Sequence, residues 1–164
     1  MKVQERISIQ DLRGVDIFAG LADHELEQIA KICSRRSYHA GERCAIQGET
    51  ADEIGIISEG KVSIEMRIEV APYTQTLGIH TLTRGNLFAW SALVEPNVLT
   101  ASARCISEVE TIRIKTSDLQ RLLRENPAIE RIVMKNLATI ISFRLRESWT
   151  QLTRLIAEMI KQGR

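Results

Sequence analysis

The sequence predicts a mainly β fold with flanking helices, either a sandwich, a jelly roll or a barrel, followed by a long C-terminal helix. Between Tyr38 and Lys115 the hydrophobic period is two residues, and glycines separate the short segments that carry it. Several short strands with regular glycine turns are typical of these folds. From about Pro127 to about Ile160 there is no further glycine or proline, and apolar residues recur at helical spacing.

The composition is that of a soluble globular protein. The chain has 164 residues, of which 44% are hydrophobic and 26% are charged, enough for one domain with an appendage. The net charge of +1 gives no argument for a nucleic-acid partner. Cys33, Cys44 and Cys105 have neither paired nor metal-ligand spacing, which predicts reduced thiols. No apolar run approaches the length of a membrane span, so the expected location is the cytoplasm, with no membrane contact.

Helical segments are expected before the β region. Asp11–Phe18 predicts a short α- or 3₁₀-helical segment. An amphipathic helix follows from Ala22 or Asp23. Its apolar face is expected to contain Leu26, Ile29, Ala30 and Cys33.

The β region contains one long alternating stretch, Lys61 to Val70, in which apolar and polar residues alternate without a break. This pattern predicts a half-buried antiparallel strand. Thr76–Thr83 is expected to be its partner, Glu53–Ile57 another strand, and Arg104–Lys115 one or two more.

Residues 85–103 form a segment unlike the rest. Gly85-Asn86 and Pro96-Asn97 predict turns, and the small-residue stretch between them predicts a helix of one or two turns. A strand is expected to begin in 100–103. A short helix between strands presents free backbone N–H groups, which suit an anion.

The C-terminal part is expected to be helical throughout. Ser117 and Gln120 predict a capping box, and Asn126-Pro127 predicts the end of that helix and the N-cap and first position of the next. We place the domain boundary here, with the β region in 1–126 and a dimerisation helix in 127–164. The long helix carries a heptad-spaced seam made of Met134, Ala138, Ile141, Leu145, Ser148, Leu152, Leu155 and Met159. A seam this long predicts a parallel two-stranded homodimer.

Catalytic chemistry is not indicated. His24, His39 and His80 lie far apart and lack metal-ligand spacing, and neither a nucleophile elbow nor an NTPase-type glycine loop is present. We therefore expect a protein that is not an enzyme, with no catalytic residue and no metal site.

Residues 85–103 resemble the phosphate-binding cassette of the cyclic nucleotide-binding domain family. Gly85, Phe88, Ala92, Leu93 and the Thr100–Ser102 run match the family pattern, and the glycine-punctuated segment 40–64 resembles the family's roll. The resemblance covers about residues 12–150. It implies a double-stranded β-helix, or jelly roll, and a non-enzymatic sensor that binds cAMP, cGMP or another small anion.

Two positions depart from the family pattern. The glutamate that holds the ribose falls on Trp90, and the arginine that holds the cyclic phosphate falls on Leu99, or on Thr100 if the loop differs by one residue. Losing both charge-assisted partners weakens binding by roughly two to four powers of ten. The resemblance implies ligand contacts at Phe88, Ala89, Trp90, Ser91, Ala92, Leu99, Thr100, Ala101 and Ser148.

Trp90 leaves two functional alternatives open. Its ring either contacts a ligand or fills the pocket, and burial of the ring favours the second by roughly 2–3 kcal/mol. The main expectation is a regulatory homodimer that acts on a partner protein without binding DNA directly, because the chain ends too soon after the long helix for a winged helix-turn-helix. The alternatives are a structural dimerisation module with a closed pocket, or a sensor of another nucleotide, an aromatic anion or haem.

Overall fold

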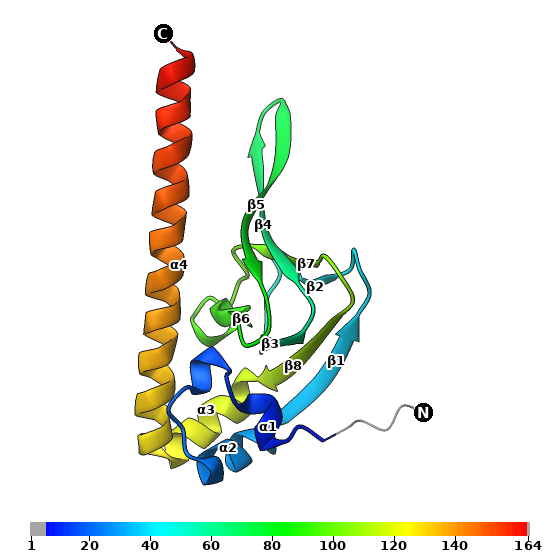
Figure 1. Cartoon of the computed structure of the whole chain (residues 1–164), viewed down its shortest axis with the longest axis vertical. Coiled ribbons are helices and arrows are strands. Elements are labelled where there is room, and N and C mark those ends of the chain that lie inside the picture. Colours follow the sequence, from blue (N-terminus) through cyan, green and yellow to red (C-terminus); the bar gives the residue numbers. More distant parts are fainter. Residues whose placement is uncertain (1–5, 164) are drawn as a thin grey trace.

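The computed structural model describes residues 6–163. A β-roll stands on a base of short helices, and one long helix, α4, rises beside it (Figure 1). The helices are α1 (Ile9–Leu12), the 3₁₀-helix η1 (Asp16–Phe18), α2 (Asp23–Ala30), the 3₁₀-helix η2 (Trp90–Leu93), α3 (Thr116–Glu125) and α4 (Pro127–Gln162). The strands are β1 (Cys33–Tyr38), β2 (Arg43–Ala45), β3 (Glu53–Glu59), β4 (Val62–Val70), β5 (Tyr73–Leu82), β6 (Leu87–Phe88), β7 (Ser102–Cys105) and β8 (Val109–Lys115).

The strands form two four-stranded sheets, in the orders β1-β8-β3-β6 and β2-β7-β4-β5. Every pairing between the named strands is antiparallel. Consecutive strands alternate between the sheets at several points, which is the arrangement of a jelly roll. The predicted fold, a jelly roll followed by a long C-terminal helix, is therefore confirmed.

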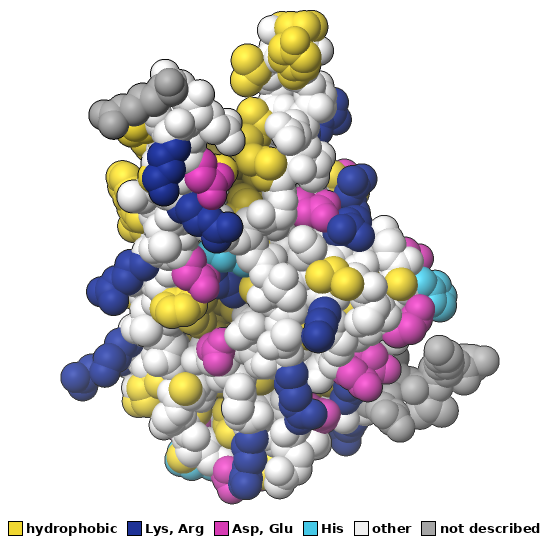
Figure 2. Space-filling model, turned by 45° about the horizontal axis from the view of Figure 1, so that its top comes forward, with side chains coloured by type: hydrophobic (Ala, Val, Ile, Leu, Met, Phe, Trp, Pro, Cys, Tyr) yellow, Lys and Arg dark blue, Asp and Glu magenta, His cyan; other side chains and the backbone are white. Residues whose placement is uncertain are grey.

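The β4–β5 hairpin confirms the strand predicted from alternation, but not its burial along the full length. Register runs from Val62 opposite Leu82 to Val70 opposite Tyr73, with a bulge between Ile64 and Glu65. Val62 is fully buried, whereas Val70 is 64% exposed, because the distal half of the hairpin projects beyond the roll (Figure 1). Hydrophobic side chains gather at the projecting tip in Figure 2.

The first strand, β1, was missed by the sequence analysis. Cys33 was expected on the apolar face of the preceding helix, but it begins β1, which pairs with β8 from Cys33–Ile114 to Tyr38–Val109. The strand is polar and half-exposed, so period-two hydrophobicity does not mark it.

The predicted capping box at the start of α3 is wrong. The helix begins at Thr116 with Lys115 at the N-cap, and no side chain caps it. Thr116 instead donates through Oγ1 to the Asp52 carbonyl, at 3.0 Å. Asn126 and Pro127 occupy the predicted positions before and at the start of α4, but the Asn126 amide donates to the Leu122 carbonyl and so closes α3.

Helix α4 is buried only at its base. Ile129, Val133 and Leu137 belong to the main core, whereas apolar residues from Ile141 onward are exposed. The helix is 36 residues long, about 54 Å at 1.5 Å per residue, and therefore extends well beyond the roll (Figure 1). Among the described residues, no helix combines the length and hydropathy that crossing a bilayer requires.

Candidate functional site: a cavity between the roll and the long helix

The segment 85–103 adopts the backbone predicted for it. Strand β6 ends at Phe88, Ala89 takes a left-handed conformation with φ of 59°, and η2 forms a single turn over Trp90–Leu93. Leu99 follows at the far side and is bridged to Gly48 and Glu49 by backbone hydrogen bonds. A four-residue 3₁₀-helix has little dipole, so backbone amides alone make a weak anion site.

Ala89 is strained, since L-residues other than Asn and Asp rarely adopt positive φ. We expect Ala89→Gly to raise the free energy of unfolding by about 1 kcal/mol, measured by urea denaturation. Ala101→Gly is the matched control: its φ is not positive, so the added chain entropy should destabilise the fold. A loss of stability in Ala89→Gly would contradict the strain argument.

A cavity of about 260 Å³ lies between this segment, the second sheet and α4. Eight of the nine predicted ligand-contact residues line it: Phe88, Ala89, Trp90, Ser91, Leu99, Thr100, Ala101 and Ser148. The ninth, Ala92, faces the main core and is 1% exposed. The remaining lining residues are Ala45, Ile64, Met66, Ile79, His80, Ala103, Ile141, Arg144 and Leu145.

Arg144 is the site residue that the sequence analysis missed. Its guanidinium carbon lies 5.2 Å from the centre of the Trp90 ring, and its Nη2 donates to the Leu87 carbonyl at 3.3 Å. Its Nη1 is buried and has no hydrogen-bond partner among residues 6–163. Burial lowers the pKa of Arg144, while Glu147 and Asp16 raise it, but a guanidinium stays charged at neutral pH. The available signal was spacing, because Arg144 lies four residues before Ser148 on one helix face.

A second arginine covers the other aromatic residue of the segment. The guanidinium of Arg113 lies 5.1 Å from the centre of the Phe88 ring, on β8. Unlike Arg144, it has partners for its charge: Glu53 at 3.4 Å and the Cys44 carbonyl at 3.4 Å. Arg113 is therefore engaged in the roll, and Arg144 is the cation that faces the cavity.

Side chains of α4 make polar contacts with the segment around η1 at its base and with the roll further along. Asn136 donates to the Ala19 carbonyl at 2.8 Å, and Arg144 bonds Leu87 as described. Glu147 lies 3.0 Å from His80 Nδ1, and Gln151 donates to the Ile79 carbonyl at 2.6 Å. A larger open cleft of about 640 Å³ lies beside these contacts, and both His80 and Arg144 line it as well as the smaller cavity.

The His80–Glu147 contact predicts a dependence of stability on pH. Desolvation lowers the pKa of His80, Glu147 raises it and Arg144 lowers it further, with a net lowering. The unfolded chain then takes up a proton near pH 6.5, and folded His80 takes one up only at lower pH, so unfolding becomes easier as the pH falls through that range. We expect the urea midpoint to fall less between pH 7.5 and pH 5.5 in His80→Gln than in the native protein. His39→Gln, which changes an exposed ring, is the control, and equal pH dependence in native protein and His80→Gln would contradict the assignment.

The fold and this cavity together define a class of protein, a jelly roll against which a long C-terminal helix packs. The family model of the cyclic nucleotide-binding domain matches residues 35–126, and the chain belongs to this family. The predicted resemblance is therefore confirmed, and with it the regulatory nature of the domain.

Individual relatives agree with the family. The chain is 29% identical to the cyclic AMP receptor protein of Thermus thermophilus over 90% of its own length and 65% of that protein's. A cyclic nucleotide-binding protein structure from Geobacter metallireducens is 28% identical, with a TM-score of 0.69 over 85% of this chain and 98% of that one. A cyclic nucleotide-binding domain from Methylobacillus flagellatus has a TM-score of 0.80 at 15% identity, covering 89% and 83%, which shows the fold. The chain spans 65% of this receptor protein and 15–26% of three further curated relatives.

Proposed function

We propose that this chain is a regulatory module that senses a small ligand in the cavity between the roll and α4 and signals through a homodimer. The observation that carries the proposal is the position of the cavity. Its walls come from the phosphate-cassette segment on one side and from Ile141, Leu145 and Ser148 of α4 on the other. A bound molecule would contact both elements at once and change how α4 packs.

Ile141, Leu145 and Ser148, which line the cavity, also belong to the heptad seam, and this supports coupling between ligand binding and dimer packing. Leu145, Leu152 and Leu155 are 49–55% exposed in the single chain, although such side chains are normally covered. Pairing with a second copy would bury them, and the cavity would then border the dimer seam. In this proposal 127–164 is the dimerisation element and 1–126 is the sensor.

In this proposal the ligand is bound without the ribose-binding glutamate and the phosphate-binding arginine of the family pattern. The resemblance implies a glutamate at Trp90 and an arginine at Leu99, or at Thr100 if the loop differs by one residue, and Leu99 is 7% exposed in the cavity wall. Without these side chains, cAMP or cGMP would lack the partners that the family pattern provides for the ribose hydroxyl and for the phosphate, since neither Trp90 nor Leu99 is charged.

A calorimetric titration tests this proposal. We expect native protein to bind cAMP and cGMP weakly, and Trp90→Glu with Leu99→Arg to gain roughly two to four powers of ten in affinity, because two charge-assisted hydrogen bonds are added. Tight native binding would refute the account of the two substitutions. The same titration on Trp90→Glu with Leu99→Lys is the matched control, since lysine lacks the bidentate geometry.

A structural dimerisation module is the second candidate, and one observation favours it. Trp90 packs against the main core and lies under Arg144, as expected for a ring that fills the pocket. Failure of the double variant to gain any cyclic nucleotide affinity, together with a stable native dimer, would support this candidate.

A further inference from the structure

We infer that Arg144 is the anion-binding residue of the cavity and that the ligand is a small carboxylate with an apolar body. The inference rests on the proposed sensing function and deepens it by naming the ligand class. It depends on three features of the described residues: the free bonding capacity of Arg144, the lining of the cavity and its size.

The first feature is that Arg144 is charged, partly buried and incompletely bonded. Its Nη2 makes one long hydrogen bond to the Leu87 carbonyl, and its buried Nη1 makes none within residues 6–163. Among the described residues, no carboxylate forms an ion pair with Arg144 at 4.0 Å or less. The nearby carboxylate of Glu147 instead lies 3.0 Å from His80 Nδ1. Arg144 therefore has hydrogen-bonding capacity that the described residues do not satisfy, and an anion seated against its guanidinium would supply a partner.

The second feature is that the cavity lining has a single permanent charge. Arg144 is the only lysine or arginine among its lining residues, and no acidic residue is present; His80 is the only other titratable group. The surrounding wall is apolar: Ile64, Met66, Ile79, Phe88, Leu99, Ile141 and Leu145. A ligand that matches this wall has one anionic group and an otherwise apolar body.

The third feature is size. The cavity of about 260 Å³ is below the range of roughly 300–1,000 Å³ typical for drug-sized ligands. A planar guanidinium binds a carboxylate through two parallel hydrogen bonds, and Trp90 beneath it holds the plane of Arg144 in place. The polar hydroxyls of a ribose would find no carboxylate in this lining, so a small organic acid fits better than a nucleotide.

The test uses two matched probes that differ in charge, phenylacetate and its neutral analogue phenylacetamide. Trp149→Phe leaves Trp90 as the only tryptophan, so fluorescence in this background reports on the ring under Arg144, and calorimetry on the native protein gives the affinities. We expect phenylacetate to bind at least tenfold more tightly than phenylacetamide and to alter Trp90 emission. Hexanoate and indole-3-acetate extend the carboxylate series in the same titrations.

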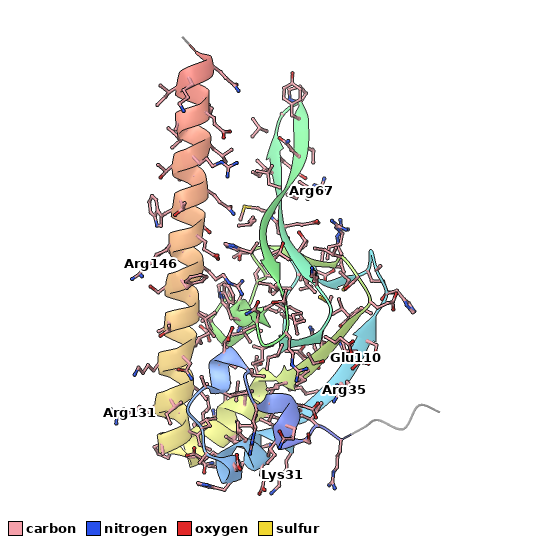
Figure 3. All side chains as sticks on the ribbon, in the orientation of Figure 1. Lys31, Arg35, Arg67, Glu110, Arg131 and Arg146 are labelled. Atoms are coloured by element: carbon pink, nitrogen blue, oxygen red, sulfur yellow. The ribbon has the colours of Figure 1, made fainter. Side chains whose placement is uncertain are left out.

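Variants of α4 separate the role of Arg144 from general charge. We expect Arg144→Gln to abolish the preference for the carboxylate, and Arg144→Lys to keep part of it. Arg146→Gln removes the same charge from a side chain that points away from the roll (Figure 3) and should leave the affinity unchanged. Thermal unfolding of all three variants confirms that each is folded.

Two outcomes would overturn the inference. One is equal affinity for phenylacetate and phenylacetamide, or an unchanged preference in Arg144→Gln. The other is no binding by any of the three carboxylates up to 10 mM. If either outcome is found and the Trp90→Glu, Leu99→Arg variant still gains cyclic nucleotide affinity, the inference alone fails and the proposed sensing function stands.

Discussion

Gly55→Ala is expected to destabilise the roll by about 2–3 kcal/mol, the upper range for overpacking a core. Gly55 lies on β3 opposite Phe88 on β6, and a Cβ at this position would overlap the Phe88 ring. The ring cannot move aside easily, because it is 1% exposed and the guanidinium of Arg113 covers it. Equilibrium denaturation in urea measures the change in the free energy of unfolding.

Two companion variants test the cause. Gly78→Ala is the matched control, because the nearest atom to its added Cβ is Ser63 Oγ at 3.6 Å, an ordinary contact, so we expect no loss. Phe88→Leu replaces the ring with a smaller side chain and makes room for the added Cβ. The double variant Gly55→Ala, Phe88→Leu should therefore lose at least about 1 kcal/mol less free energy of unfolding than the sum of the losses in the two single variants. Additive losses would show that the Gly55–Phe88 contact is not the source of the destabilisation.

Much of the fold could be predicted because its strongest elements carry period-specific hydrophobic patterns. The alternation of residues 61–70 identified β4, and the absence of glycine and proline after Pro127 identified α4. β1 was missed because its burial depends on pairing with β8, and its own residues are polar. Exposure of Val70 was missed because alternation gives the face of a strand, and not how far the strand extends beyond its neighbours.

The candidate site shows the same division between local and long-range information. The run from Phe88 to Ser91 is close in sequence and was expected in one place, and the structure brings Leu99, Thr100 and Ala101 beside it. Arg144 was missed because an arginine on an amphipathic helix usually lies in solvent, as Arg146 does. Arg144 comes to lie over Trp90 through the tertiary packing of α4, whose Val133 and Leu137 are buried in the main core.

Leu152→Glu is expected to convert the proposed homodimer into a monomer. Leu152 is half-exposed in the single chain and belongs to the a/d seam that a second copy would cover. Each buried leucine contributes about 1.5–3 kcal/mol, so changing both copies costs about 3–6 kcal/mol. Two carboxylates facing each other in a parallel pair add repulsion. The dimer dissociation constant should rise by roughly two to four powers of ten.

Sedimentation equilibrium measures this change, and Thr150→Glu is the matched control. Thr150 is exposed and lies two residues before Leu152, at the heptad position on the side of the helix away from the seam. The same added charge there should leave the dimer intact. Because Val133 and Leu137 anchor the base of α4 to the roll, the Leu152→Glu monomer should keep the native urea midpoint at low protein concentration. A dimer that persists in Leu152→Glu, or one that dissociates equally in Thr150→Glu, would exclude the seam as the dimer interface and would also remove the proposed route from the cavity to the partner subunit.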